Sequence, residues 1–138
     1  MGDQVAPAGP AVVLIVEDEW LLRELAVELV EAAGFVALEA GHAEVAMAVL
    51  EARCDVAAIF TDINLPGRFD GLELAHIVHD RWPRIGILVA SGRIRPKQSD
   101  LPPNSTFLEK PYRGAEVIAH LRSLIAPALA LVGSDTLS

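Results

Sequence analysis

At four places in the sequence, a chemically reactive side chain directly follows a run of apolar residues. The first run ends on the acidic pair Glu17 and Asp18, and a later run ends on a third carboxylate, Asp62. Two further runs lead to Ser91 and to Lys110. A carboxylate nucleophile, a lysine and a hydroxyl are the groups needed to accept and orient a phosphoryl group. These residue types therefore predict phosphoryl transfer to a carboxylate, provided that the fold brings them together.

The three carboxylates also predict a metal site. Carboxylates that lie close together repel one another, so the pKa of one of them rises unless a cation lies between them. Oxygen ligands without a nearby His or Cys select a hard divalent ion, and an open, shallow cluster suits Mg²⁺ better than Ca²⁺. We therefore expect Glu17, Asp18 and Asp62 to bind Mg²⁺.

The elements that must position these groups alternate between strand and helix patterns. Short apolar runs indicate strands, and apolar residues at helical spacing indicate helices. Leu22, Leu25, Leu29 and Ala33 share one face of the first expected helix, away from most of its charged residues. The strands are expected over 11–16, 35–40, 56–61, 85–91 and 105–109, and the helices over 20–34, 43–53, 71–82 and 115–125.

The segment 92–104 lacks the helix that the alternation would place there. It contains Pro96, Pro102 and Pro103 and few apolar residues, so at most a turn or two is expected. Short connections between strands and helices otherwise indicate βαβ units, a parallel sheet and helices on both faces. Ligand sites in such sheets lie beyond the carboxyl ends of the strands. If the first, third, fourth and fifth strands are neighbours in that order, the reactive groups stand side by side.

Composition limits the class of protein and its partners. With 138 residues, of which 52% are hydrophobic, the chain is expected to form one packed domain over 11–126, with a flexible leader at 1–10 and a fraying tail at 127–138. A net charge of -8 argues against nucleic acid and anionic membranes as partners. The single cysteine, Cys54, and the absence of a signal-peptide pattern or of a long apolar run indicate a reducing compartment, and we expect the protein in the cytoplasm.

Four motifs resemble those of a known family. The stretches LIVEDE, FTDINLPG, LVASG and FLEKPY are similar to the signatures of bacterial response-regulator receiver domains, the phosphoacceptor modules of two-component signalling. All four occur in order, each at an expected strand end, over about 12–125. The resemblance implies an α/β, flavodoxin-like (βα)5 three-layer sandwich with a parallel sheet of order 2-1-3-4-5, here with a short or irregular fourth helix.

The resemblance also implies a role for each residue of the metal site. Asp62 would be the phosphorylated residue, and Asp18 would bind Mg²⁺ directly with assistance from Glu17. The backbone carbonyl of Asn64 would be a further ligand, and the Asn64 side chain could influence hydrolysis. The segment 65–71 is one residue longer than the usual receiver pattern, so this loop is expected to be shaped for a particular partner.

Further roles follow from the same resemblance. Ser91 would donate a hydrogen bond to a phosphoryl oxygen and act in switching, and Lys110 would pair with the phosphoryl group. Phe107 stands at the family's aromatic switch position, without the hydroxyl that a tyrosine would have there. Arg93 could influence hydrolysis of the acyl phosphate, and the bond between Lys110 and Pro111 is expected to be cis.

The leading hypothesis is a stand-alone receiver that is not an enzyme, because the chain ends about a dozen residues after its last expected helix. A sensor histidine kinase or a phosphotransfer protein would phosphorylate it, and it would then bind an unknown downstream protein, as a monomer or a weak homodimer. One alternative is a receiver-like binding module without phosphotransfer, which the weak fourth helix favours. Another is an aspartyl-phosphate phosphatase, but such hydrolases need a second Asp two residues after the nucleophile, where this chain has Asn64.

Overall fold

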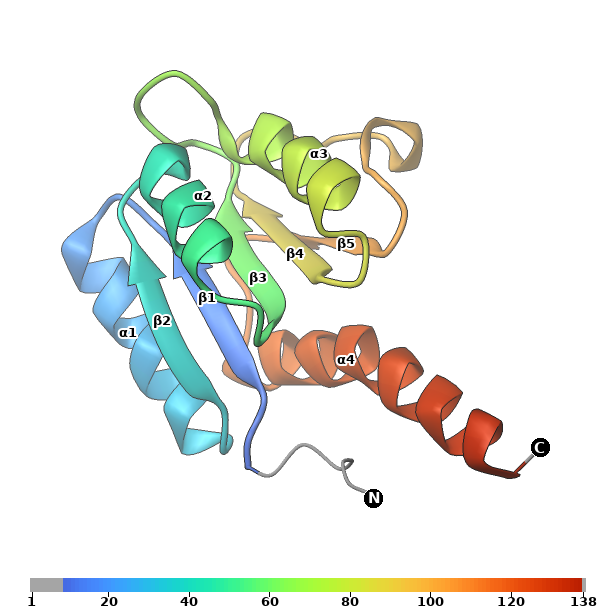
Figure 1. The fold of residues 1–138 in the computed structure, drawn as a ribbon. Coiled ribbons are helices and arrows are strands. Elements are labelled where there is room, and N and C mark those ends of the chain that lie inside the picture. The colour runs from blue at the N-terminus through green and yellow to red at the C-terminus, as the bar shows by residue number, and fades with distance from the viewer. Residues whose placement is uncertain (1–8, 138) are drawn as a thin grey trace.

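The computed structural model describes residues 9–137, with side chains placed up to residue 126 (Figure 1). In this part of the chain five strands alternate with four helices, and a single 3₁₀ turn precedes the last strand. The elements are β1 (Val12–Val16), α1 (Trp20–Ala32), β2 (Val36–Ala40), α2 (Ala43–Ala52), β3 (Val56–Asp62), α3 (Gly71–Arg81), β4 (Gly86–Ser91), η1 (Gln98–Asp100), β5 (Ser105–Glu109) and α4 (Gly114–Leu137).

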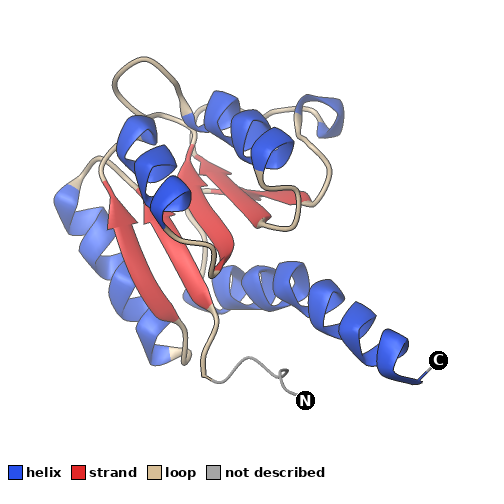
Figure 2. Cartoon of the chain, viewed as in Figure 1, coloured by secondary structure: helices blue, strands red, loops and turns tan. Residues whose placement is uncertain are grey.

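The strands form one parallel sheet in the order β2-β1-β3-β4-β5. Helices α1 and α4 pack on one face of the sheet, and α2 and α3 pack on the other, so the molecule has three layers (Figure 2). This arrangement confirms the predicted flavodoxin-like fold and its strand order. The 3₁₀ turn η1 confirms the expectation of a short fourth helix. A longer helix does not form here because the surrounding prolines cannot supply the N–H groups that it needs.

The central strand β1 explains the continuous apolar run in the sequence. All five of its residues are buried. Leu14 and Val16 point into the core under α2 and α3, whereas Val13 and Ile15 point into the core under α1 and α4. A strand that is covered on both faces needs apolar residues at every position, not at every second one.

Helix α1 packs on the sheet through a different face from the one that its leucines mark. Its buried residues are Ala26, Val27 and Val30. Leu22 and Leu25 are 39% and 53% exposed. Leu29 packs partly against the core under α1 and α4. Leu22, Leu25 and Leu29 line a hollow together with Glu17 and Lys110, which directly follow β1 and β5.

Helix α4 is longer than the sequence predicted. It runs from Gly114 to Leu137, so the segment after Pro127, which we expected to fray, has a helical backbone. Pro127 removes one backbone donor, but the alanines and leucines after it have high helix propensity. The division of the chain at residue 126 stays a prediction, and residues 1–8 of the expected leader lie outside the described part. No helix in residues 9–137 is long and apolar enough to cross a membrane.

Candidate functional site

The sheet brings the predicted reactive residues to one edge. Glu17 directly follows β1, Asp62 is the last residue of β3, Ser91 is the last residue of β4, and Lys110 directly follows β5. Neighbouring strands are paired so that each ends within one residue of the next. The four groups therefore stand in a row at the carboxyl edge, as the sequence predicted.

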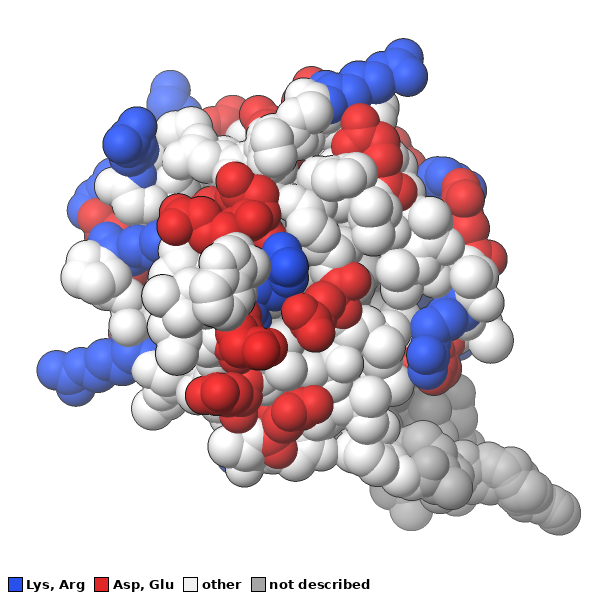
Figure 3. All heavy atoms as spheres, turned by 90° about the vertical axis from the view of Figure 1, so that its left-hand side faces the viewer, with Lys and Arg blue, Asp and Glu red and all other residues white. Residues whose placement is uncertain are grey.

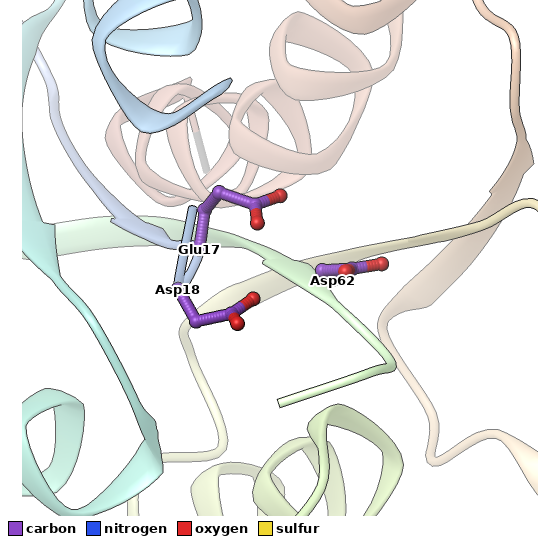
Figure 4. A group of neighbouring side chains, drawn as sticks. All are labelled: Glu17, Asp18 and Asp62. Atoms are coloured by element: carbon purple, nitrogen blue, oxygen red, sulfur yellow. The ribbon is translucent and has the colours of Figure 1, made fainter. Parts of the chain in front are cut away.

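The three carboxylates converge on a common space. Glu17, Asp18 and Asp62 each place one carboxylate oxygen within 4.8 Å of the others (Figure 4). Glu17 is buried, Asp62 is partly buried and Asp18 is exposed, so the cluster extends from the core to the surface. Oxygen donors in this arrangement can hold a hard divalent cation such as Mg²⁺.

Lys110 is the basic group nearest to two of these carboxylates in the described chain. Its Nζ lies 3.4 Å from Oδ1 of Asp62 and 3.8 Å from Oε1 of Glu17. The lysine attracts Asp62 through charge alone, because Oδ1 of Asp62 is buried and has no hydrogen-bond partner among the described residues. A buried carboxylate oxygen without a hydrogen bond is uncommon in folded proteins. This oxygen therefore fits a bound cation, which would supply the interaction that the protein does not.

Burial is the main reason why the pKa of Glu17 is raised above its ordinary value. The negative charge of Asp62 raises it further. The backbone N–H of Glu19, which donates to Oε2 of Glu17 at 3.1 Å, and the charge of Lys110 act in the opposite direction. The opposing interactions are weaker, so ionised Glu17 is destabilised until further positive charge is supplied.

Ser91 is buried, with 1% of its surface exposed. Its Oγ accepts hydrogen bonds from the backbone N–H groups of Arg93 at 3.3 Å and Ile94 at 3.0 Å. These bonds use the lone pairs of the oxygen and leave the hydroxyl hydrogen available as a donor. Ser91 therefore both fixes the start of the loop after β4 and keeps a donor at the carboxyl edge.

The loop after Asp62 is held by three features of the chain. A Cβ atom on Gly71 would lie 2.0 Å from the backbone oxygen of Asp62, so only glycine fits at this position. Asp70 caps α3 by accepting from the N–H of Glu73 at 2.8 Å. The carboxylate of Glu44 in α2 accepts the N–H of Arg68 at 3.2 Å and so ties the longer loop to a neighbouring helix.

The other residues predicted from the sequence have known positions in the structure, but their positions do not test their roles. The bond between Lys110 and Pro111 is cis, as expected. Phe107 is partly buried against the core under α2 and α3. Asn64 and Arg93 are exposed. The switching role of Phe107, the metal-binding role of the Asn64 backbone carbonyl and the influence of Asn64 and Arg93 on hydrolysis stay predictions.

Arg23 belongs to the site, although its sequence pattern did not predict this. Its Nη1 donates to the backbone oxygen of Glu17 at 2.8 Å. An arginine on the first turns of a helix usually faces solvent, so its residue type gave no indication of this bond. Its position six residues after Glu17, near the start of the helix that follows the acidic pair, was the available signal.

Comparison with known proteins identifies the family. A family model described as response regulator receiver domain matches residues 13–122, and the chain belongs to this family. Similar solved structures include a response regulator receiver protein from Sinorhizobium medicae WSM419, with a TM-score of 0.79, 24% identity, and coverage of 85% of this chain and 95% of that chain. A sensor protein from Polaromonas sp. JS666 has a TM-score of 0.74 at 27% identity and covers 85% of this chain and 97% of its own. The receiver domain of the hybrid histidine kinase CckA has a TM-score of 0.71 at 25% identity, and the match covers 83% of this chain and 99% of that chain.

Proposed function

We propose that this receiver domain accepts a phosphoryl group on Asp62 in a Mg²⁺-dependent reaction, and that phosphorylation controls its binding to another protein. The phosphoryl group would come from a phosphohistidine on a sensor histidine kinase or a phosphotransfer protein. The observation that carries the proposal is the buried Oδ1 of Asp62, which lacks a hydrogen bond and lies 3.4 Å from Nζ of Lys110.

The transfer forms one bond and breaks one. A carboxylate oxygen of Asp62 attacks the phosphorus, and the bond from phosphorus to the donor's imidazole nitrogen breaks with its electron pair on that nitrogen. The departing imidazole is neutral when its other nitrogen carries a proton. Lys110 is close enough to Asp62 to pair with the added negative charge, and Ser91 has a hydroxyl hydrogen to donate to a phosphoryl oxygen.

The cation would be held by Glu17, Asp18 and Asp62. The family resemblance adds the backbone carbonyl of Asn64 as a further ligand. When bound, Mg²⁺ supplies positive charge that offsets the carboxylates and the phosphoryl oxygens. The raised pKa of Glu17 supports this assignment, because a cation would relieve the cost of its ionised form.

An exposed apolar surface beside the acceptor supports a protein as the phosphodonor. A hollow of about 550 Å³ is lined by Leu22, Leu25 and Leu29 of α1 and by Tyr112, and it shares Glu17 and Lys110 with the acceptor site. Trp20, at the start of the same helix, is 69% exposed. A donor whose phosphohistidine reaches Asp62 would cover this surface, and we propose that it does so with an apolar helix face.

The remaining features of the proposal follow from the family and the residues. The chain would act as a signalling module without catalytic turnover of its own, since Asn64 occupies the position where an aspartyl-phosphate phosphatase needs a second Asp. We place it in the cytoplasm with its phosphodonor, as a monomer or a weak homodimer. The downstream partner would be a protein, because a net charge of -8 disfavours nucleic acid.

Labelling with acetyl phosphate tests the proposal directly. We expect intact-mass analysis to show one added phosphoryl group on the wild-type protein in the presence of Mg²⁺, and none after chelation. Asp62→Asn should abolish labelling, whereas Asp80→Asn, an exposed aspartate in α3, should label like wild type. Equal labelling of wild type and Asp62→Asn would contradict the proposal, and normal Mg²⁺ binding without labelling would favour the binding-module alternative.

A further inference from the structure

Arg23 connects three elements at the edge of the metal site. It lies on α1, and its side chain is 24% exposed. Its Nη1 donates to the backbone oxygen of Glu17 at 2.8 Å, and its Nε donates to Oε1 of Glu39 in β2 at 3.2 Å. The guanidinium group thus joins the start of α1, the end of β1 and the end of β2.

Hydrogen bonds hold the backbone of Glu17 on both sides, and the bond from Arg23 holds its carbonyl oxygen. On the other side, the N–H of Glu17 donates to the backbone oxygen of Ala40 at 3.0 Å. The carbonyl of Glu17 belongs to the planar peptide unit that joins Glu17 to Asp18. Holding that oxygen therefore sets the direction in which the chain presents both acidic side chains, at a point where β1 has ended and its ladder no longer constrains the backbone.

The register of the sheet explains why Glu39 meets Arg23. Glu39 pairs with Ile15 of β1, and Ile15 points into the core under α1 and α4. Side chains at paired positions of adjacent parallel strands point to the same face of the sheet. Glu39 therefore points toward the α1 layer, where it orients the guanidinium. Strand β2, which places no reactive group at its own end, contributes to the site through this pair.

We propose that Arg23 is a positioning residue for the cation site. It acts through the Glu17 carbonyl and does not touch the cation or the phosphoryl group. Arginine suits this task because its planar fork donates in two directions at once, whereas lysine offers a single charged group on a flexible stem. The inference rests on the proposed function in one respect, namely that the carboxylate cluster binds Mg²⁺.

Four variants of the full chain test this role, with Mg²⁺ alone as the probe and calorimetry as the readout. Arg23→Met removes both bonds and keeps most of the apolar stem. We expect it to weaken Mg²⁺ binding about tenfold, because mutating a residue that orients a metal ligand commonly lowers metal affinity by this factor or more. Arg23→Lys should recover part of the affinity. Glu39→Gln keeps the bond to Glu17 and should have the smallest effect. The matched control is Arg122→Met, because Nη2 of Arg122 also donates to a backbone oxygen of the α1 region, Ala33, away from the site.

The readouts separate positioning from general support of the fold. A merely structural role predicts a lower free energy of unfolding for Arg23→Met with unchanged Mg²⁺ affinity, and this result would overturn the inference. If Arg23→Met does not fold, Arg23→Lys decides: a folded variant with weaker Mg²⁺ binding supports the role, and wild-type affinity overturns it. If wild type itself binds no Mg²⁺, the proposed function fails together with the inference. If wild type binds and labels normally and Arg23→Met does too, only the inference fails.

Discussion

Single residues in the acceptor site are held in an arrangement that costs the fold stability. Three carboxylates lie close together, Lys110 pairs with two of them, Glu17 and Asp62, and burial raises the pKa of Glu17. A carboxyl group whose pKa is higher in the folded state binds its proton more tightly there than in the unfolded chain. The fold therefore gains stability as the pH falls through this raised pKa, and ionised Glu17 destabilises it at higher pH.

The first prediction is that Glu17→Gln stabilises the metal-free protein at pH 7. The amide removes the buried charge and can still accept the N–H of Glu19, so we expect a higher free energy of unfolding than in wild type. Urea denaturation in the presence of a chelator measures it. The difference in the free energy of unfolding between Glu17→Gln and wild type should narrow as the pH falls toward 4.5, because wild-type Glu17 then becomes protonated. A less stable variant at pH 7 would show that ionised Glu17 supports the metal-free fold.

A second residue-level prediction concerns the close approach of the backbone at Gly71. Gly71→Ala would place a Cβ atom 2.0 Å from the backbone oxygen of Asp62, so one or both of these backbone segments would have to move. We expect a loss of about 3 kcal/mol or more in urea denaturation and slower labelling of Asp62. Gly92→Ala is the control, since its Cβ would meet only Cβ of Lys110, at 3.5 Å. Wild-type stability of Gly71→Ala would mean that the loop after β3 adapts easily.

The elements of the fold could be predicted wherever one physical signal dominates. Continuous apolar runs marked the strands because helices cover both faces of the sheet. The meeting of the reactive residues at one edge could be predicted because parallel strands place their carboxyl ends at the same edge. Leu22 and Leu25 marked the wrong face of α1, since apolar residues line more than one side of this helix and the smaller Ala26 and Val27 allow closer packing. The bond from Arg23 to Glu17 depends on three-dimensional packing that no local pattern encodes.

The exposed leucines of α1 lead to a prediction at the scale of this helix. Leu25 is 53% exposed and lines the hollow beside the acceptor, so Leu25→Ser should change stability little. We expect it to lower kcat/KM for transfer from a phosphorylated protein donor about tenfold, because a contact of this kind is worth more than 1 kcal/mol at a central position. Labelling by acetyl phosphate should stay at the wild-type rate.

Val45→Ser provides the matched control for this helix. Val45 is 40% exposed on α2, on the opposite face of the sheet, and should leave both reactions unchanged. Equal loss of both reactions in Leu25→Ser would place its effect in the acceptor site and not in docking. Equal effects of Leu25→Ser and Val45→Ser on the protein donor would remove α1 as the docking surface.

The charge of the whole molecule reinforces the local repulsion. The chain carries a net charge of -8, and acidic side chains gather in the middle of the face that Figure 3 presents, with basic ones mostly toward its rim. Helix α1 exposes Glu24, Glu28 and Glu31 beside its leucines. A donor that docks there would need basic residues around an apolar helix face. The same excess of negative charge raises the local concentration of divalent cations around the site.

Mg²⁺ should therefore stabilise the entire fold through this one site. A ligand that binds only the folded state adds RT ln(1 + [L]/Kd), which is about 2.7 kcal/mol at a concentration one hundred times Kd. We expect Mg²⁺ to raise the urea midpoint of wild type at pH 7 without changing the dependence on urea, because the surface exposed on unfolding is the same. Sodium at matched ionic strength screens charge without bridging carboxylates, so it should do much less. Asp18→Asn removes the exposed ligand of the cluster and should lose most of the shift. An equal shift in Asp18→Asn would mean that Mg²⁺ acts on the general surface charge, and that the three carboxylates do not form a specific site.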